Sequence, residues 1–369
     1  MLISLLANAS TASEDLSNDA LMNFAGNISY DVRDLTVNGS PIDAAKNQSF
    51  SIAIPARNLS GCQAWDFLVL KVTSNSTEGS IASEVSALKG SDGSLLWQKE
   101  YPDAIAYAFL VDDLDGDGSS DVVVDLALEG MKFIPYSELL VLDGRNGTEI
   151  WRRPNFLAAT IAYPLNKTML LVHLFSIDPV SKTAVTKISS VLTANGTETD
   201  SRIFNGAIAI EYPANNLTGK GAHDSITSAY IINEKNSSVS TVIAALRSAD
   251  RSELWNKIFR DIAIAIPNDD MTGDGLSDIV VYEMHTWENS TNESISLFRG
   301  SDGVMLWQRL YNGSVAIASS VPDLTGDGIM DFIIYEFGGP DKEDTGVEAV
   351  KGDDGTLLWR RPSMILLPQ

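Results

Sequence analysis

The sequence predicts an all-β fold, a β-propeller of about seven four-stranded blades, and three observations support this prediction. A unit of about 52 residues recurs along the 369-residue chain, and this is the length of a four-stranded propeller blade. Each unit contains four short β-branched or alternating runs bounded by glycine-rich turns, which is the pattern of strands. No helical period of comparable length is present. Radial repetition of such units covers most strand edges, so a ring of blades is the expected architecture.

A tryptophan motif ends most of the repeats. A turn residue precedes the tryptophan by four positions and is glycine in every copy except the one with Arg251. The motif closes at Trp97, Trp151, Trp255, Trp307 and Trp359. A degenerate copy around 194–197, ending near Phe204, fills the one double interval. Because the motif places one tryptophan in each blade that carries it, we expect this residue to pack against the next blade rather than to form a sugar-stacking surface.

The fifth repeat shows the strands expected in every blade, which are 262–267, 279–283, 295–299 and 304–309. The first of these, Ile262-Ala-Ile-Ala-Ile266, is rich in small residues. A strand near a crowded central axis needs small side chains on one face, so we expect this strand to be the innermost one of its blade.

The repeats divide a single propeller domain into blades at 50–100, 101–153, 154–205 (degenerate), 206–258, 259–311 and 312–361. Segments 1–49 and 362–369 remain. Met364–Pro368 resembles an innermost strand, and 1–7, 28–35 and 40–45 supply three further runs. We therefore expect the two termini to form a seventh blade, which either closes one molecule or completes a neighbouring copy.

An aspartate motif recurs in the same rhythm and predicts about three Ca²⁺ ions. Positions 1, 3, 5 and 9 offer side-chain oxygens, position 7 offers a carbonyl, and glycines at positions 4 and 6 let the chain curl around an ion. Hard oxygen donors in a flexible loop suit Ca²⁺ better than Mg²⁺ or zinc. The expected ligands are Asp113, Asp115, Asp117, Ser119 and Asp121; Asp270, Thr272, Asp274, Leu276 and Asp278; and Asp323, Thr325, Asp327, Ile329 and Asp331.

Two weaker copies of this motif, 58–66 and 216–224, are expected to bind no calcium. Cys62 and Lys220 replace the aspartate at position 5, and both copies begin with an asparagine that is also a glycosylation acceptor. An EF-hand is excluded because its position 12 requires glutamate, whereas the three full loops have Val124, Val281 or Ile334 there.

Composition limits the classes of partner. The formal net charge of −23 excludes nucleic acid and anionic membrane surfaces as partners and favours cations. No run of 18 or more apolar residues is present, so no membrane-spanning helix is expected. The single cysteine, Cys62, excludes an intrachain disulfide.

Asparagine acceptor sequences indicate N-linked glycans, and hence a secreted or cell-surface protein. They are far more frequent than chance would give, although Pro41 weakens the one at Asn38. The others are at Asn8, Asn27, Asn47, Asn58, Asn75, Asn146, Asn166, Asn195, Asn216, Asn236, Asn289, Asn292 and Asn312.

These motifs carry a family resemblance. Ala87-Leu-Lys-Gly-Ser-Asp-Gly-Ser-Leu-Leu-Trp97 is similar to the repeat of pyrroloquinoline-quinone-type propellers, and the aspartate loops resemble the FG-GAP repeat of integrin α-chain-like propellers. The resemblance implies calcium at the loops and tryptophan docking between blades. The adjacent cysteine pair of the quinone enzymes is absent.

We expect a secreted structural, adhesive or surface-filament component that is not an enzyme. Its expected partners are extracellular proteins, glycans or copies of itself, and an acidic, glycosylated propeller without disulfides suits an archaeal surface protein. The alternatives are a quinoprotein-like or glycan-processing enzyme and a carbohydrate- or protein-binding module. The three histidines, His173, His223 and His285, lie in different repeats and have no metal-ligand partner at helical spacing.

Overall fold

The structure is a computed structural model that describes residues 48–61, 64–75, 80–128, 136–214, 216–219, 224–233, 238–247, 251–287, 290–338 and 346–362. Within these residues the fold is all-β, with six four-stranded antiparallel sheets and no helix. None of the described segments is therefore a helix that could span a membrane. The terminal strands expected at 1–7, 28–35, 40–45 and 364–368 lie outside the described residues.

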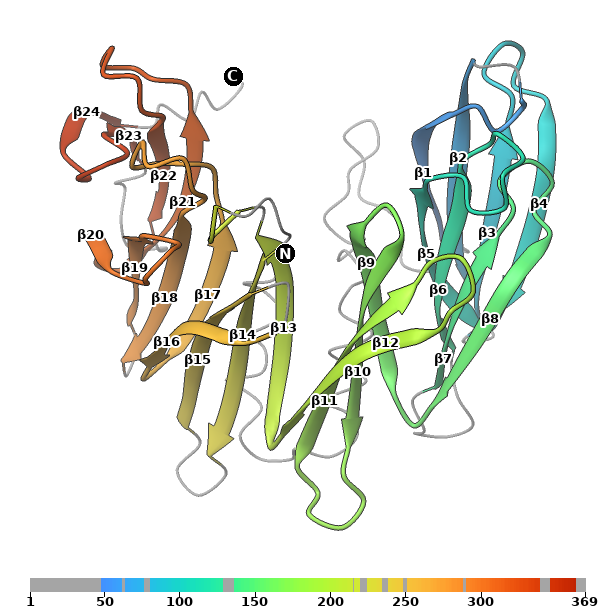
Figure 1. Ribbon diagram of the computed structural model, residues 1–369, viewed down its shortest axis with the longest axis horizontal. Coiled ribbons are helices and arrows are strands. Elements are labelled where there is room, and N and C mark those ends of the chain that lie inside the picture. The colour runs from blue at the N-terminus through green and yellow to red at the C-terminus, as the bar shows by residue number, and fades with distance from the viewer. Residues whose placement is uncertain are drawn as a thin grey trace. The chain divides into compact units, whose positions relative to one another are not determined.

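The chain divides into two compact units, residues 1–205 and 206–369. In each sheet the strands lie side by side in chain order (Figure 1). The sheets of the first unit are β1 (Gln48–Arg57), β2 (Trp65–Asn75), β3 (Ser80–Leu88) and β4 (Leu95–Pro102); β5 (Ala104–Val111), β6 (Asp121–Leu128), β7 (Tyr136–Leu142) and β8 (Glu149–Phe156); and β9 (Ala159–Asn166), β10 (Met169–Ile177), β11 (Ala184–Leu192) and β12 (Glu198–Asn205).

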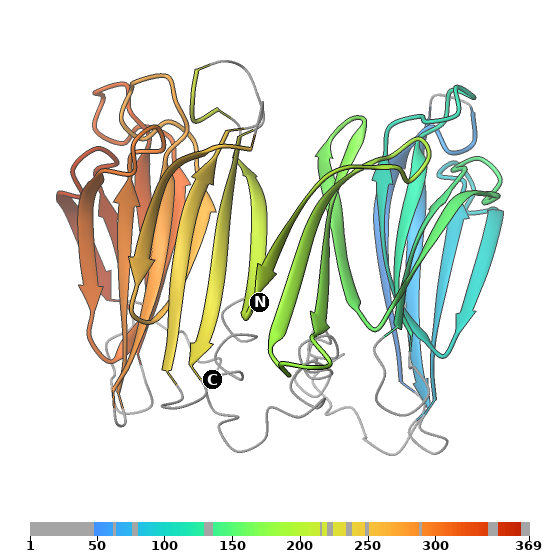
Figure 2. The same cartoon turned by 60° about the horizontal axis from the view of Figure 1, so that its bottom comes forward.

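The second unit has the same plan, and Figure 2 shows its three sheets from a second direction. They are β13 (Ala207–Ala214), β14 (Asp224–Asn233), β15 (Ser238–Leu246) and β16 (Glu253–Phe259); β17 (Ile262–Pro267), β18 (Ile279–Trp287), β19 (Ser290–Phe298) and β20 (Met305–Tyr311); and β21 (Ser314–Val321), β22 (Asp331–Gly338), β23 (Gly346–Val350) and β24 (Leu357–Pro362).

Apolar side chains fill the space between consecutive sheets of a unit. On β6, Val122 and Val124 pack toward the sheet β1–β4, whereas Val123 faces the sheet β9–β12. Successive strand residues point to opposite faces, so a strand covered on both faces reads as a continuous apolar run. The first strand of a sheet contacts the middle strands of the preceding sheet, and small side chains such as Ala106 and Ala108 are buried in that contact. This placement explains the small residues of the first strands.

The tryptophans dock consecutive sheets, as predicted, at four of the five motifs. The indole Nε1 donates to a carbonyl oxygen in the following sheet at 2.6–2.8 Å in Trp97, Trp151, Trp255 and Trp307. A Cβ added at Gly303 would lie 2.6 Å from the Trp255 ring, so only glycine allows this contact. Trp359 is the exception, because 43% of its surface is exposed.

A buried carboxyl lies between the last two sheets. Glu293 of β19 is fully buried, its Oε2 accepts the Ala316 N–H at 2.5 Å, and its Oε1 has no hydrogen-bond partner among the described residues. Burial raises the pKa of Glu293 to about 7. The folded state therefore holds this proton more tightly than the unfolded state, and stability is lost as the pH rises from about 4.5 through 7.

We expect Glu293→Gln to raise the free energy of unfolding at pH 8 by about 2–3 kcal/mol. At pH 4.5 its effect should be much smaller. The neutral amide keeps an oxygen for the Ala316 N–H and removes the buried charge. Denaturant unfolding at the two pH values measures the difference, with exposed Glu100→Gln as the control. An equal effect of Glu293→Gln at both pH values would contradict the assignment.

Candidate calcium loops

The first aspartate loop joins β5 to β6, and its backbone is wrapped around the carboxylate of Asp113. Asp113 Oδ1 accepts the Gly116 N–H at 2.7 Å, and Oδ2 accepts the Gly118 N–H at 2.8 Å. Both glycines have φ near +85°, a conformation that favours glycine. The backbone N–H groups, that of Gly118 first, hold the pKa of Asp113 below its ordinary value. The loop thus presents an ionised carboxylate at its centre.

Three carboxylates converge in this loop. Asp113, Asp115 and Asp117 each offer an oxygen, and these oxygens lie within 4.8 Å of one another. Asp115 and Asp117 also each accept one loop N–H, at 3.0 and 2.7 Å. The Ser119 side chain is buried and its Oγ has no hydrogen-bond partner among the described residues. This set of hard oxygen donors can hold a divalent cation.

The ninth residue of the loop, Asp121, also has a structural role, which the sequence analysis did not predict. Asp121 is fully buried, its Oδ2 accepts the Leu114 N–H at 2.7 Å, and its Oδ1 accepts the Gly144 N–H at 3.0 Å. It therefore ties the loop to the turn between β7 and β8. Burial raises its pKa to about 6. Each carboxylate oxygen carries two lone pairs, so these bonds leave acceptor capacity for a cation.

The loops 270–278 and 323–331 repeat this arrangement. Asp270 Oδ2 and Asp323 Oδ2 accept the N–H of the sixth residue of their loops at 2.7 Å. Asp278 and Asp331 are fully buried and accept the N–H groups of Gly300 and Gly352, each at 3.1 Å.

Both of these loops differ from the first at position 3, and the third loop also has a lysine close to its position 5. Position 3 is threonine, and the hydroxyls of Thr272 and Thr325 donate to the first aspartate of their loops at 3.3 Å. In the third loop, Lys351 Nζ lies 3.1 Å from Asp327 Oδ2. The first loop, with three carboxylates, therefore has the strongest donor set, although Arg145 Nε lies 3.6 Å from its Asp117 Oδ2.

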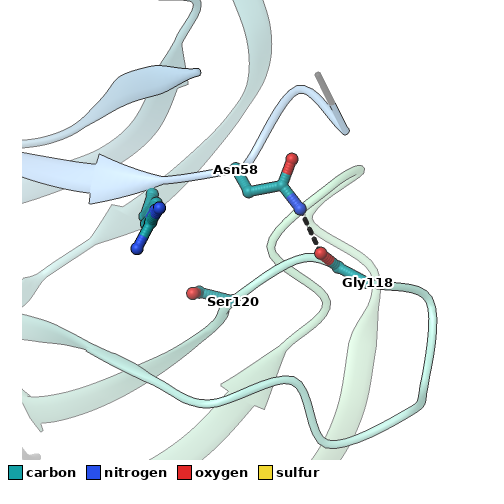
Figure 3. A pocket seen from close by; sticks show the side chains of 4 residues that line it. Asn58, Gly118 and Ser120 are labelled. Atoms are coloured by element: carbon teal, nitrogen blue, oxygen red, sulfur yellow. Dashed lines mark hydrogen bonds between the residues drawn. The ribbon is translucent and has the colours of Figure 1, made fainter. Parts of the chain in front are cut away.

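Each of the two weaker copies forms hydrogen bonds with the full loop that comes next in the sequence. Asn58 Nδ2 donates to the Gly118 carbonyl (Figure 3), beside a shallow cavity of about 370 Å³ lined by Arg57, Asn58, Gly118 and Ser120. In the second unit, Asn216 Nδ2 lies 3.5 Å from the Gly275 carbonyl, and the Ser277 N–H donates to the Asn216 carbonyl at 2.9 Å.

These weaker copies keep the aspartate at position 9 after losing the others. Asp66 accepts the Gly90 N–H at 2.9 Å, and Asp224 accepts the Leu217 N–H at 3.1 Å. Asp66 and Asp224 are the only aspartates of the motif that the weaker copies keep. This is the signal in the sequence that position 9 has a structural role.

The structure describes eight of the thirteen expected glycosylation asparagines. Asn146, Asn195 and Asn312 are exposed, Asn58, Asn216 and Asn292 are half-buried, and Asn75 and Asn166 end strands β2 and β9. The Asn292 side chain accepts the Gly313 N–H at 2.8 Å. The remaining positions, Asn8, Asn27, Asn47, Asn236 and Asn289, lie outside the described residues.

One polar cluster was missed by the sequence reasoning. Asp261, Glu283 and His285 each offer an atom suited to a metal, and these atoms lie within 4.8 Å of one another. The signal available in the sequence was the i, i+2 spacing of Glu283 and His285, which places both side chains on one face of a strand.

No known protein family matches the sequence, and no curated protein is similar to it in sequence. Several solved structures are similar in fold. The exotype rhamnogalacturonan lyase YesX is 15% identical with a TM-score of 0.49, and the match covers 89% of this chain and 59% of the lyase chain. The β-propeller domain of the Trilobed protease from Pyrococcus furiosus, which has an open velcro topology, is 12% identical, with 85% and 83% coverage and a TM-score of 0.39.

Synechocystis apocarotenoid oxygenase is 9% identical with a TM-score of 0.43, and the match covers 78% of this chain and 70% of the oxygenase. The Trilobed protease domain is described as a β-propeller, and at these identities any likeness concerns the fold alone. The chain spans less than two thirds of the length of the lyase that it matches.

The comparisons correct one prediction. The chain was expected not to be an enzyme, but the solved structures similar in fold include a lyase and an oxygenase. A fold that enzymes use gives no ground for excluding catalysis, so that prediction was wrong as an inference from fold and motif.

Proposed function

We propose that the protein is an extracellular, N-glycosylated β-propeller that binds Ca²⁺ at its three aspartate loops, and that each ion stabilises one end of the sheet that carries its loop. The observation that carries this proposal is the convergence of the Asp113, Asp115 and Asp117 carboxylates, with related loops at 270–278 and 323–331. Carboxylates held this close repel one another unless a cation lies between them.

The chemistry of the donors favours Ca²⁺ over other cations. The first loop offers only oxygen atoms, in a chain that glycines allow to curl. Ca²⁺ accepts six to eight oxygens in irregular geometry, Mg²⁺ requires a near-ideal octahedron, and zinc prefers nitrogen and sulfur. Extracellular calcium modules bind with dissociation constants on the order of 10⁻⁴–10⁻³ M, and we expect the first loop to be the tightest of the three.

Calorimetric titration of the chelated protein with Ca²⁺ tests this proposal, with three sites as the expected result. The double change Asp115→Asn and Asp117→Asn should remove one site, because the amide oxygens can still accept the loop N–H groups but carry no charge. Asp92→Asn is the matched control, since Asp92 accepts a turn N–H in the same way outside the loops. Three sites in the double variant, or no binding to the wild type, would refute the assignment.

We also propose that Met364–Pro368 and three runs within residues 1–45 supply the strands of a seventh blade. The support is Trp359, which repeats the docking motif but has 43% of its surface exposed among the described residues, whereas Trp97, Trp255 and Trp307 are 6–9% exposed. A further blade would cover this ring in the way that the following sheets cover the others.

Trp359→Ala measures whether this ring is docked. If a seventh blade covers it, the substitution should lower the free energy of unfolding by about 3–5 kcal/mol, as truncation of a buried tryptophan does. Denaturant unfolding of the full chain provides the number. A loss below about 1 kcal/mol, typical of a surface position, would contradict the seventh blade.

The partners proposed are extracellular proteins, glycans or further copies of the chain. The exposed acceptors Asn146, Asn195 and Asn312 lie in turns after β7, β11 and β20. A structural or adhesive module with calcium-braced loops is the function that these features support best.

The second candidate is an enzyme of the quinoprotein-like or glycan-processing class. The observation that favours it is the cluster of Asp261, Glu283 and His285, which combines an imidazole with two carboxyls. Release of new chain ends from a polysaccharide by the wild type, abolished in a folded His285→Gln variant, would favour this function over the structural one.

A further inference from the structure

Strand register brings together three side chains that are up to 24 residues apart in the sequence. Glu283 and His285 lie on the same face of β18, two residues apart. Glu283 is paired with Ala263 of β17 and Met284 with Ile262, so the next position outward, Asp261, lies beside His285. His285 Nδ1 is 2.9 Å from Asp261 Oδ2, and His285 Nε2 is 3.7 Å from Glu283 Oε2.

The backbone around Asp261 is fixed by Thr241 of β15. The Thr241 hydroxyl donates to the Asp261 carbonyl at 2.8 Å and accepts the Ala263 N–H at 3.0 Å. The three clustered side chains are only 15–33% exposed. Val281, two residues before Glu283 on the same face, belongs to the apolar core between the first two sheets of this unit. The cluster is therefore held at the margin of a packed core rather than on a free loop.

The cluster lies at the opposite end of the sheet from the calcium loop of the same repeat. Loop 270–278 joins the end of β17 to the beginning of β18, whereas Asp261 precedes β17 and His285 lies near the end of β18. Six residues of β17 separate the two ends, a length of about 20 Å. The two sites are thus separate and can be tested independently.

The charges of the cluster are not balanced by basic side chains. Among the described residues no lysine or arginine forms an ion pair with Asp261 or Glu283, and the side chain that contacts both carboxyls is His285. Two carboxyl groups thus share this space with one imidazole. A divalent cation would neutralise the pair.

We propose that Asp261, Glu283 and His285 form a second kind of metal site, one that takes a divalent transition metal of the Zn²⁺ class. One imidazole nitrogen and two carboxylate oxygens supply three protein ligands and leave a position open for water. The ligand atoms that the three side chains offer lie within 4.8 Å of one another, as the ligands of a single ion must. The imidazole distinguishes this site from the oxygen-only calcium loops.

The test uses Co²⁺ as a visible probe and Zn²⁺ as its competitor, on protein saturated with Ca²⁺ so that the aspartate loops are filled. We expect the wild type to bind one equivalent of Co²⁺ with the strong visible absorption of a four-coordinate site, and Zn²⁺ to displace it. His285→Gln and Glu283→Gln should each weaken Co²⁺ binding at least tenfold. Asp302→Asn, an exposed position in the same sheet, should leave it unchanged.

Folding is checked by the melting temperature of each variant without transition metal. Asp261→Asn is the second variant, because an amide oxygen can keep the contact with His285 Nδ1 while the charge is lost. Two outcomes would overturn the proposal. One is equal Co²⁺ affinity in the wild type and in folded His285→Gln, and the other is a wild type that binds no Co²⁺.

Discussion

Removal of calcium is expected to lower the melting temperature more than any single substitution in the loops. An ion that binds only the folded state adds about 2.7 kcal/mol at a hundred times its dissociation constant, and three loops contribute independently where they share no contacts. Without the ions, the Asp113, Asp115 and Asp117 carboxylates repel one another. Thermal unfolding with calcium and with excess chelator measures the difference.

Two controls make this result specific. Magnesium at the same concentration should restore little of the lost stability, because the curled loop does not supply octahedral geometry. The variant with Asp115→Asn and Asp117→Asn should lose more than about one third of the calcium effect, because the first loop is expected to bind Ca²⁺ most tightly. Identical melting curves with calcium and with chelator would show that the loops are polar turns without a structural ion.

Trp255→Ala is expected to lower the free energy of unfolding by about 3–5 kcal/mol. The ring lies against Gly303, its Nε1 donates to the Gly300 carbonyl at 2.7 Å, and the side chain belongs to the core between two sheets. The substitution removes this packing and leaves a buried carbonyl without its donor. Denaturant unfolding in saturating calcium provides the measurement.

Trp65→Ala is the matched control, because Trp65 is 63% exposed and lies outside the docking rhythm. It should change the free energy of unfolding by less than about 1 kcal/mol. If Trp255→Ala left stability intact but abolished binding of a partner, the docking tryptophans would instead be a recognition surface.

Much of the fold was predictable because each repeat contains its own local signals. The fifth repeat shows how far these reach: β17 has the predicted bounds, 262–267, whereas β18 continues four residues past the predicted end at 283, to Trp287. This extension was not predicted because Glu283 and His285 interrupt the apolar run. The pairing of β18 with β19 nevertheless continues to Trp287 and Ser290. The degenerate third repeat was recovered by spacing, although Asp200 stands at the register position that tryptophan occupies in the other repeats.

The candidate sites could be predicted where their residues lie in one loop. They could not be predicted where strand pairing brings distant residues together. The spacing of Asp113, Asp115 and Asp117 placed three carboxylates in one loop, and their oxygens are within 4.8 Å of one another. The bond from Gly144 to Asp121 joins residues 23 apart, and the Asp261–His285 contact joins residues 24 apart. Only the pairing of strands brings such residues together, so no short motif reveals them.

The central proposal is a glycosylated propeller that holds three calcium ions, and native mass spectrometry of the protein as its own cells produce it tests this proposal most directly. In calcium we predict a mass above that of the polypeptide by attached glycans and three Ca²⁺ ions, and chelation should remove the ions while the glycans remain. The variant with Asp115→Asn and Asp117→Asn should retain two ions. A protein whose mass is that of the bare polypeptide in calcium would contradict the account.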